Sequence, residues 1–143
     1  MREIGDKQAE GTILGNLGIA YVVLGDAPKG AALFEQRLAG AREIGDKRGE
    51  GAVFGNLGNL YADSGDDRKA LEFYEKQLEI SRAIADKHGE SKSMWNSALV
   101  LNRLGDRAQA IARAEATLAI FEAIGHPDTS KIRAKLAEWR GQA

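Results

Sequence analysis

The 143-residue chain contains no cysteine and only two prolines. The absence of cysteine excludes disulfides, thiol catalysis and thiolate ligands for a metal, and it is compatible with a reducing compartment. The scarcity of proline permits long uninterrupted helices. No apolar run approaches the roughly 18–20 residues that span a bilayer, and no apolar signal segment follows Met1. We therefore expect a cytoplasmic protein without a membrane partner.

Neither sign of charge is in excess, because 20 basic and 21 acidic residues are interspersed along the chain. This balance predicts no nucleic-acid partner. The only histidines, His88 and His126, lie far apart and match no metal-site spacing. No glycine-rich phosphate loop occurs, and no serine has a recognisable catalytic partner. We expect no enzymatic activity, no catalytic residues, no metal and no cofactor.

A six-residue segment recurs at intervals of 40 residues. Residues 2–7, with the sequence REIGDK, return unchanged at 42–47 and in weakened form at 82–87. A fixed period of this length is typical of stacked supersecondary units. The pattern predicts one domain over residues 1–143, with repeats at about 2–41, 42–81 and 82–121.

Each repeat carries two marks that predict a helix end followed by a new helix start. In a mark, a glycine in the left-handed conformation ends one helix and an aspartate caps the next, and the mark at residues 85–86 keeps the aspartate but has alanine in place of the glycine. The marks are Gly25-Asp26, Gly65-Asp66 and Gly105-Asp106 within the repeats, and Gly5-Asp6, Gly45-Asp46 and Ala85-Asp86 at their starts. Between them lie segments of about 17–18 residues with apolar spacing of three and four. Each repeat is therefore expected to be a helical hairpin.

Small residues recur at two matching positions of the predicted hairpins. They are Gly18, Gly58 and Ala98 in the middle of the first helix, and Gly30, Ala70 and Ala110 early in the second. Small side chains at paired positions allow two helices to approach closely, and larger ones would wedge them apart.

The spacing of these residues resembles that of the tetratricopeptide repeat family. The matching residues are Leu17, Gly18, Tyr21, Gly25, Phe34 and Leu38, and then Leu57, Gly58, Tyr61, Gly65, Ala70, Tyr74 and Leu78. The third unit departs from the pattern with Ser97, Ala98, Leu101 and Ala114. The period exceeds the common value of about 34, and is similar to that of Leu-Gly-Asn-repeat proteins, kinesin light chains and bacterial signalling arrays.

The resemblance implies an all-α, right-handed α-solenoid of antiparallel helix pairs, with three hairpins and a C-terminal capping helix. The capping helix is expected at about 127–141, with Ile132, Leu136 and Trp139 on its apolar face. Residues 1–6 look like the end of a preceding helix. We therefore expect either a piece of a longer array, with a larger bacterial signalling protein as one candidate, or a first unit that a partner covers.

Asparagine occupies one equivalent place in all three units, at Asn16, Asn56 and Asn96. Because asparagine is a poor helix former, its recurrence within helices requires a reason. One hypothesis is a ladder of amides on the concave groove that binds the backbone of an extended peptide. The alternative is that each amide binds a neighbouring helix or a buried water.

The groove hypothesis predicts further binding residues on the first helices of the units, some of which vary as a specificity surface would. They are Ile19, Asn59, Asp63, Lys92, Trp95, Leu99, Asn102 and Arg103. Trp95 is either an exposed anchor for the ligand or a residue packed into the neighbouring core. The two-lysine carboxylate clamp of the family is not reproduced, because only Lys92 stands at a suitable place.

Two functions follow. The favoured one is a non-catalytic module that holds a peptide segment or helix of a partner protein in its concave groove. The alternative is self-association into a homodimer or other homo-oligomer through the uncapped first repeat. That repeat would expose Ile13, Leu14, Leu17, Leu33 and Phe34.

Overall fold

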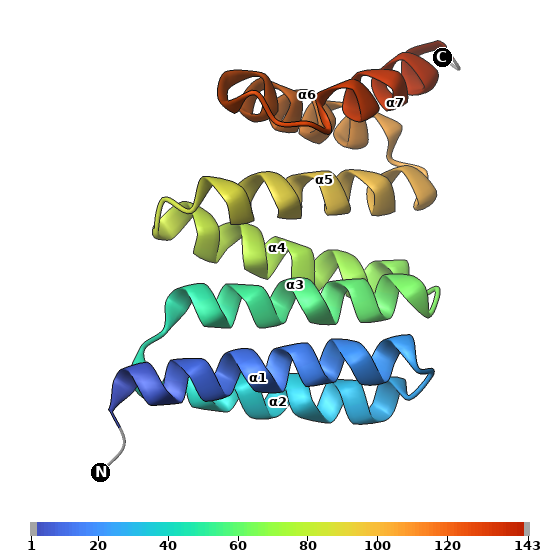
Figure 1. Ribbon diagram of the computed structural model, residues 1–143. Coiled ribbons are helices and arrows are strands. Elements are labelled where there is room, and N and C mark those ends of the chain that lie inside the picture. Colours follow the sequence, from blue (N-terminus) through green and yellow to red (C-terminus); the bar gives the residue numbers. More distant parts are fainter. Residues whose placement is uncertain (1–2, 142–143) are drawn as a thin grey trace.

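The computed structural model describes residues 3–141, and within them every regular element is an α-helix (Figure 1). The helices are α1 (Ile4–Val23), α2 (Ala27–Ile44), α3 (Lys47–Asp63), α4 (Asp67–Ala83), α5 (Lys87–Arg103), α6 (Arg107–Ile124) and α7 (Thr129–Gly141). Consecutive helices pack as antiparallel pairs, and the pairs stack along one direction. The predicted all-α helical-repeat solenoid, with three hairpins and a capping helix, is confirmed.

The turns inside the hairpins have the predicted geometry. Gly25, Gly65 and Gly105 adopt left-handed conformations with φ of +92°, +84° and +92°. The aspartate after each glycine accepts a hydrogen bond from the backbone N–H three residues later, at 3.1 Å for Asp26 and 3.2 Å for Asp66. The cap satisfies one of the amide groups that a helix start leaves unpaired.

The turns between repeats follow the same design at two of three predicted places. Gly45 has φ +70°, and Asp46 accepts from the N–H of Gly49. Ala85 takes the glycine's place with φ +56°, the sole non-glycine residue with positive φ in the described chain. The left-handed conformation brings the Cβ of an L-residue close to the backbone, so Ala85 is strained.

The prediction of a helix boundary at Gly5-Asp6 is wrong. Helix α1 already begins at Ile4, after Glu3 in an extended conformation, and it continues through Gly5 and Asp6. Asp6 therefore lies in the first turn, where its negative charge favours the helix dipole without capping a new helix. Gly5 therefore lies inside α1 and does not mark a helix end in the described chain. The expectation for Met1 and Arg2 lies outside the described residues.

The first helices of the repeats form the inner side of the stack. Backbones of α1 and α3 approach within 8 Å, as do those of α3 and α5, whereas no such approach links α2 with α4 or α4 with α6 in the described chain. A stack curves toward the side on which the helices of successive repeats lie closer together. Helices α1, α3 and α5 therefore line the concave face.

Within each hairpin, two residues face each other where the helices touch, and the sizes of their side chains are matched. A Cβ added at Gly18 would lie 2.6 Å from a ring carbon of Phe34, and one at Gly58 would lie 2.5 Å from the ring of Tyr74. In the third hairpin, the equivalent residues are Ala98 and Ala114, and both are fully buried. The loss of glycine in the third unit is thus matched by the loss of the aromatic ring opposite.

Helix α7 closes one end of the stack. Ile132, Leu136 and Trp139 are buried in one cluster with residues of α5 and α6. Arg133, Glu138 and Arg140 lie exposed on α7. Across residues 3–141, no helix combines the length and hydropathy needed to cross a membrane.

Candidate functional site

The concave face contains a cleft between α1 and α3, which we call the α1–α3 cleft. Its volume is about 270 Å³. Apolar side chains from both helices, including Ile19, Val22 and Leu60, form its walls. Asn56, Asn59, Asp63 and Lys92 also line it, so a ligand there would meet an apolar surface edged with polar groups.

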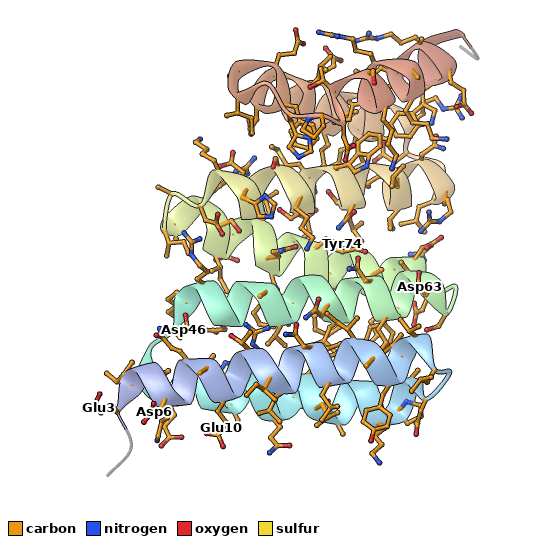
Figure 2. All side chains as sticks on the ribbon, viewed as in Figure 1. Glu3, Asp6, Glu10, Asp46, Asp63 and Tyr74 are labelled. Carbon is orange, nitrogen blue, oxygen red and sulfur yellow. The ribbon has the colours of Figure 1, made fainter. Side chains whose placement is uncertain are left out.

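A second cleft of about 270 Å³, the α3–α5 cleft, follows along the same face. Asn96, Leu99 and Arg103 from α5 face Asn59 and Asp63 from α3 across it. Asn59 and Asp63 line both clefts, and Figure 2 places Asp63 at the C-terminal end of α3. The two clefts therefore form one groove across three repeats.

Two members of the asparagine ladder line the groove, Asn56 in the α1–α3 cleft and Asn96 in the α3–α5 cleft, whereas Asn16 of α1 lines neither cleft. Asn16 is exposed, and Asn56 and Asn96 are half-buried. None of the three side chains forms a hydrogen bond within residues 3–141, and none has an atom that is both buried and unsatisfied. The direct helix-to-helix bonds that the alternative explanation invokes are thus absent from the described chain.

The two other predicted asparagines are already engaged. The Tyr74 hydroxyl donates a hydrogen bond to Oδ1 of Asn59. The Arg107 guanidinium donates to Oδ1 of Asn102 at 3.1 Å. Their oxygens help to hold α4 and α6 in place, and the Nδ2 group of Asn59 remains available in the groove.

Arg103, at the end of α5, forms a two-pronged ion pair with Asp67 of the preceding repeat, at 3.0–3.2 Å. The hydrogen bonds to Asp67 raise the pKa of Arg103 above its usual value. Burial, followed by the negative charge of Asp63, raises the pKa of Tyr74 to about 12. Tyr74 (labelled in Figure 2) therefore stays protonated and keeps its hydrogen bond to Asn59 at neutral pH.

Trp95 is half-buried, and its ring stacks on Trp139 of α7 with centroids 6.2 Å apart. This contact joins the last repeat to the capping helix. It agrees with the second role considered for Trp95, packing into a neighbouring core. The equivalent residues Gly15 and Gly55 are buried, against the side chains of Arg37 and Gln77 of the second helices.

A third opening, the α5–α7 cleft, has a volume of about 190 Å³. Lys92, Trp95 and His88 line it from α5, and Phe121, His126 and Lys131 contribute from α6, the following turn and α7. Lys92 also lines the α1–α3 cleft. The residues described contain no group of three or more histidine and acidic side chains that could hold a metal.

Sequence reasoning missed several residues that shape these openings. Tyr74 belongs to a second helix, yet it lines the α3–α5 cleft because Gly58 leaves room for its ring beneath α3. The opposed glycine and aromatic residue were the available signal. The stacking of His126 on Phe121, with centroids 3.8 Å apart, had no signal in the repeat pattern.

A family model described as tetratricopeptide repeat matches residues 9–83, and the resemblance noted from the sequence is confirmed. No curated protein sequence matches the chain. Solved structures share the fold at low sequence identity, and three of them are described next.

The N-terminal domain of stress-induced protein-1 (STI-1) from C. elegans is 16% identical with a TM-score of 0.74, and the alignment covers 98% of this chain and 99% of that one. The apo form of RapI is 20% identical with a TM-score of 0.87, and the alignment covers 99% of this chain but 51% of RapI. A putative kinesin light chain with nearly identical TPR-like repeats, from Podospora anserina, is 18% identical with a TM-score of 0.77. That alignment covers 97% of this chain and 67% of the other.

Proposed function

Because the chain belongs to the tetratricopeptide repeat family, whose fold generally serves protein–protein interaction, we propose that it is a non-catalytic module that binds a partner's peptide segment in its concave groove. The supporting observation is the ladder of Asn16, Asn56 and Asn96, whose amides have no partner in the described chain and lie one repeat apart. An amide offers both a donor and an acceptor, as a peptide backbone requires.

The clefts beside the ladder give the peptide's side chains places to bind. The α1–α3 cleft offers apolar walls, and the α3–α5 cleft offers a mixed surface with Leu99. Backbone hydrogen bonds would hold any extended segment, and the pockets would select its side chains, as in other modes of peptide recognition.

The test is selection of a phage-displayed library of random peptides on the immobilised protein. Recovered peptides should bind the wild type and lose at least tenfold in affinity for the triple variant Asn16→Ala, Asn56→Ala, Asn96→Ala. This is the effect of losing about 0.5–1.5 kcal/mol per hydrogen bond at three sites. The matched control replaces Gln36, Glu72 and Gln109, exposed polar residues of the second helices. Equal affinity for all three proteins would refute groove binding.

Self-association is a second candidate, favoured by the exposure of α1. Ile13 and Leu17 are 65% and 44% exposed, whereas Val53 and Leu57 at the equivalent places of α3 are 0% and 5% exposed. In α3, these positions pack against Phe34 of the preceding repeat. The α1 surface thus exposes apolar side chains at the positions that, in α3, pack one repeat against the preceding one.

The exposed set is smaller than the sequence predicted. Leu14 and Leu33 are half-buried, and Phe34 is buried against α3. The described part of α7 presents charged side chains at the other end of the stack, so the expected contact is between two α1 surfaces related by a two-fold axis. Sedimentation velocity at low and high concentration should then show a dimer for the wild type and a monomer for Ile13→Glu/Leu17→Glu. A wild-type monomer at the highest concentration would exclude this function.

A further inference from the structure

The α5–α7 cleft gathers positive charge that no ion pair among the described residues neutralises. Lys92 and Lys131 line it, and neither side chain forms an ion pair or hydrogen bond within residues 3–141. Elsewhere, cations are commonly paired, as Arg103 is with Asp67 and Arg113 with Glu75. The two lysines come from different helices and border the same cavity, so their charges act on whatever enters it.

The two histidines add hydrogen-bond donors to this cleft. Nδ1 of His126 accepts a hydrogen bond from the backbone N–H of Asp128 at 3.0 Å, which leaves the proton of the neutral ring on Nε2. The ring is fixed in position by stacking on Phe121. Asp128 is the one acidic residue among those lining the cleft, against two lysines. The cleft therefore has an excess of positive charge at neutral pH.

The remaining walls are largely apolar. Trp95, Phe121 and Ile132 contribute them, and Phe121 and Ile132 are buried. A charged group that enters such a site interacts more strongly with the lysines than it would on an open surface, because less water surrounds it. The cleft volume of about 190 Å³ exceeds the space of a few water molecules, at about 30 Å³ each.

The α5–α7 cleft is connected with the groove through Lys92, which also lines the α1–α3 cleft. A peptide that runs along the asparagine ladder can therefore place one side chain in each cleft. We infer that the α5–α7 cleft receives an acidic side chain of the bound polypeptide, a carboxylate or a phosphoryl ester, held between Lys92 and Lys131. This inference rests on the proposed function and adds the chemical class of the partner.

The protein provides its own probes for a test. His88 and His126, its two histidines, both line the cleft, and its two tryptophans are Trp95, in the cleft, and Trp139, stacked on it. Proton NMR of the imidazole signals, with the two rings assigned from a His88→Gln variant, would follow titration with three blocked peptides at pH 7.5. The probes are acetyl-Ala-Leu-X-X-Ala-amide with X as glutamate, phosphoserine or glutamine.

The glutamate or the phosphoserine peptide should shift both imidazole signals and bind about fivefold to tenfold more tightly than the glutamine peptide, as one or two charge-assisted contacts imply. Tighter binding of phosphoserine alone would identify the phosphoryl ester as the source, and binding of both would show that a carboxylate suffices. Equal binding of all three peptides would overturn the inference.

Two charge-reversal variants, Lys131→Glu in the cleft and Arg68→Glu outside it, distinguish a specific effect of the cleft from a general effect of net charge. Lys131→Glu should abolish the preference for the acidic peptides, and Lys92→Gln should weaken it. Arg68→Glu alters an exposed cation of α4 without an ion pair in the described chain, and it should leave the preference intact. A loss as large in Arg68→Glu as in Lys131→Glu would refute a specific site. If acidic and neutral phage-selected peptides bind alike and still depend on the asparagine ladder, this inference fails while the proposed function stands.

Discussion

The ring of Tyr74 in α4 lies directly against the backbone of Gly58 in α3, so closely that a Cβ at Gly58 would stand 2.5 Å from a ring carbon. The hydroxyl of the same ring reaches Asn59 in the groove. One residue thus fills the contact between two helices and orients a groove side chain, so the packing of the hairpin and the shape of the binding surface depend on each other.

Gly58→Leu should be among the most destabilising single substitutions. The added side chain must displace the Tyr74 ring or separate α3 from α4, and overpacking of this kind costs about 1–3 kcal/mol. Gly40→Ala is the matched control, because nothing lies within 4 Å of a Cβ at that position. Alanine is the better helix former, so this variant should melt higher than the wild type. Equal melting temperatures for the two variants would contradict the packing argument.

Ala85→Gly should stabilise the protein. Ala85 holds φ +56° at the turn between α4 and α5, a conformation that costs an L-residue about 1–2 kcal/mol and glycine little. Part of the gain is offset by the greater freedom of glycine in the unfolded chain. Thermal unfolding should show a modestly raised melting temperature. Ala83→Gly, two residues earlier in helix α4, should lower it, and a lowered value for both would show that the turn is unstrained.

The triple replacement of Asn16, Asn56 and Asn96 by alanine should leave the melting temperature unchanged or slightly raised. The three amides make no hydrogen bond within the described residues, and alanine favours the helix by several tenths of a kcal/mol per site. A buried structural role would give the opposite sign, because an orphaned buried partner costs about 1–3 kcal/mol. A differential scanning experiment on the free protein distinguishes the two.

Alkaline pH should destabilise the protein through Tyr74. Burial raises the pKa of this phenol to about 12 in the folded state, from an ordinary value near 10. The unfolded state therefore loses the proton first, and the stabilisation present below pH 10 declines between about pH 10 and 12. Urea titrations across this range should show a smaller decline for Tyr74→Phe than for the wild type. Parallel declines would assign the effect to other groups.

The sequence determined the repeat architecture because each helix boundary is a local event. Gly25 with Asp26, and Gly65 with Asp66, end one helix and start the next through their own backbone and side-chain geometry. The small residues at Gly18 and Gly58 likewise revealed where the helices meet, since the repeat placed them in register. The same reasoning failed at Gly5-Asp6, where the motif is present but no helix of the described chain comes before it.

The tertiary structure alone decided which polar groups of the groove are available. Asn56 and Asn59 look alike in the sequence, yet the fold brings the Tyr74 hydroxyl to Asn59 and no hydrogen-bond partner from residues 3–141 to Asn56. Arg103 has its charge neutralised by Asp67 from another repeat, while Lys92 and Lys131, beside one cleft, have no ion-pair partner in the part of the chain that the structure describes. These outcomes depend on side chains that are distant in the sequence and meet only when repeats stack. The 40-residue period fixes where such positions recur, and it does not specify which partners they meet across a helix contact.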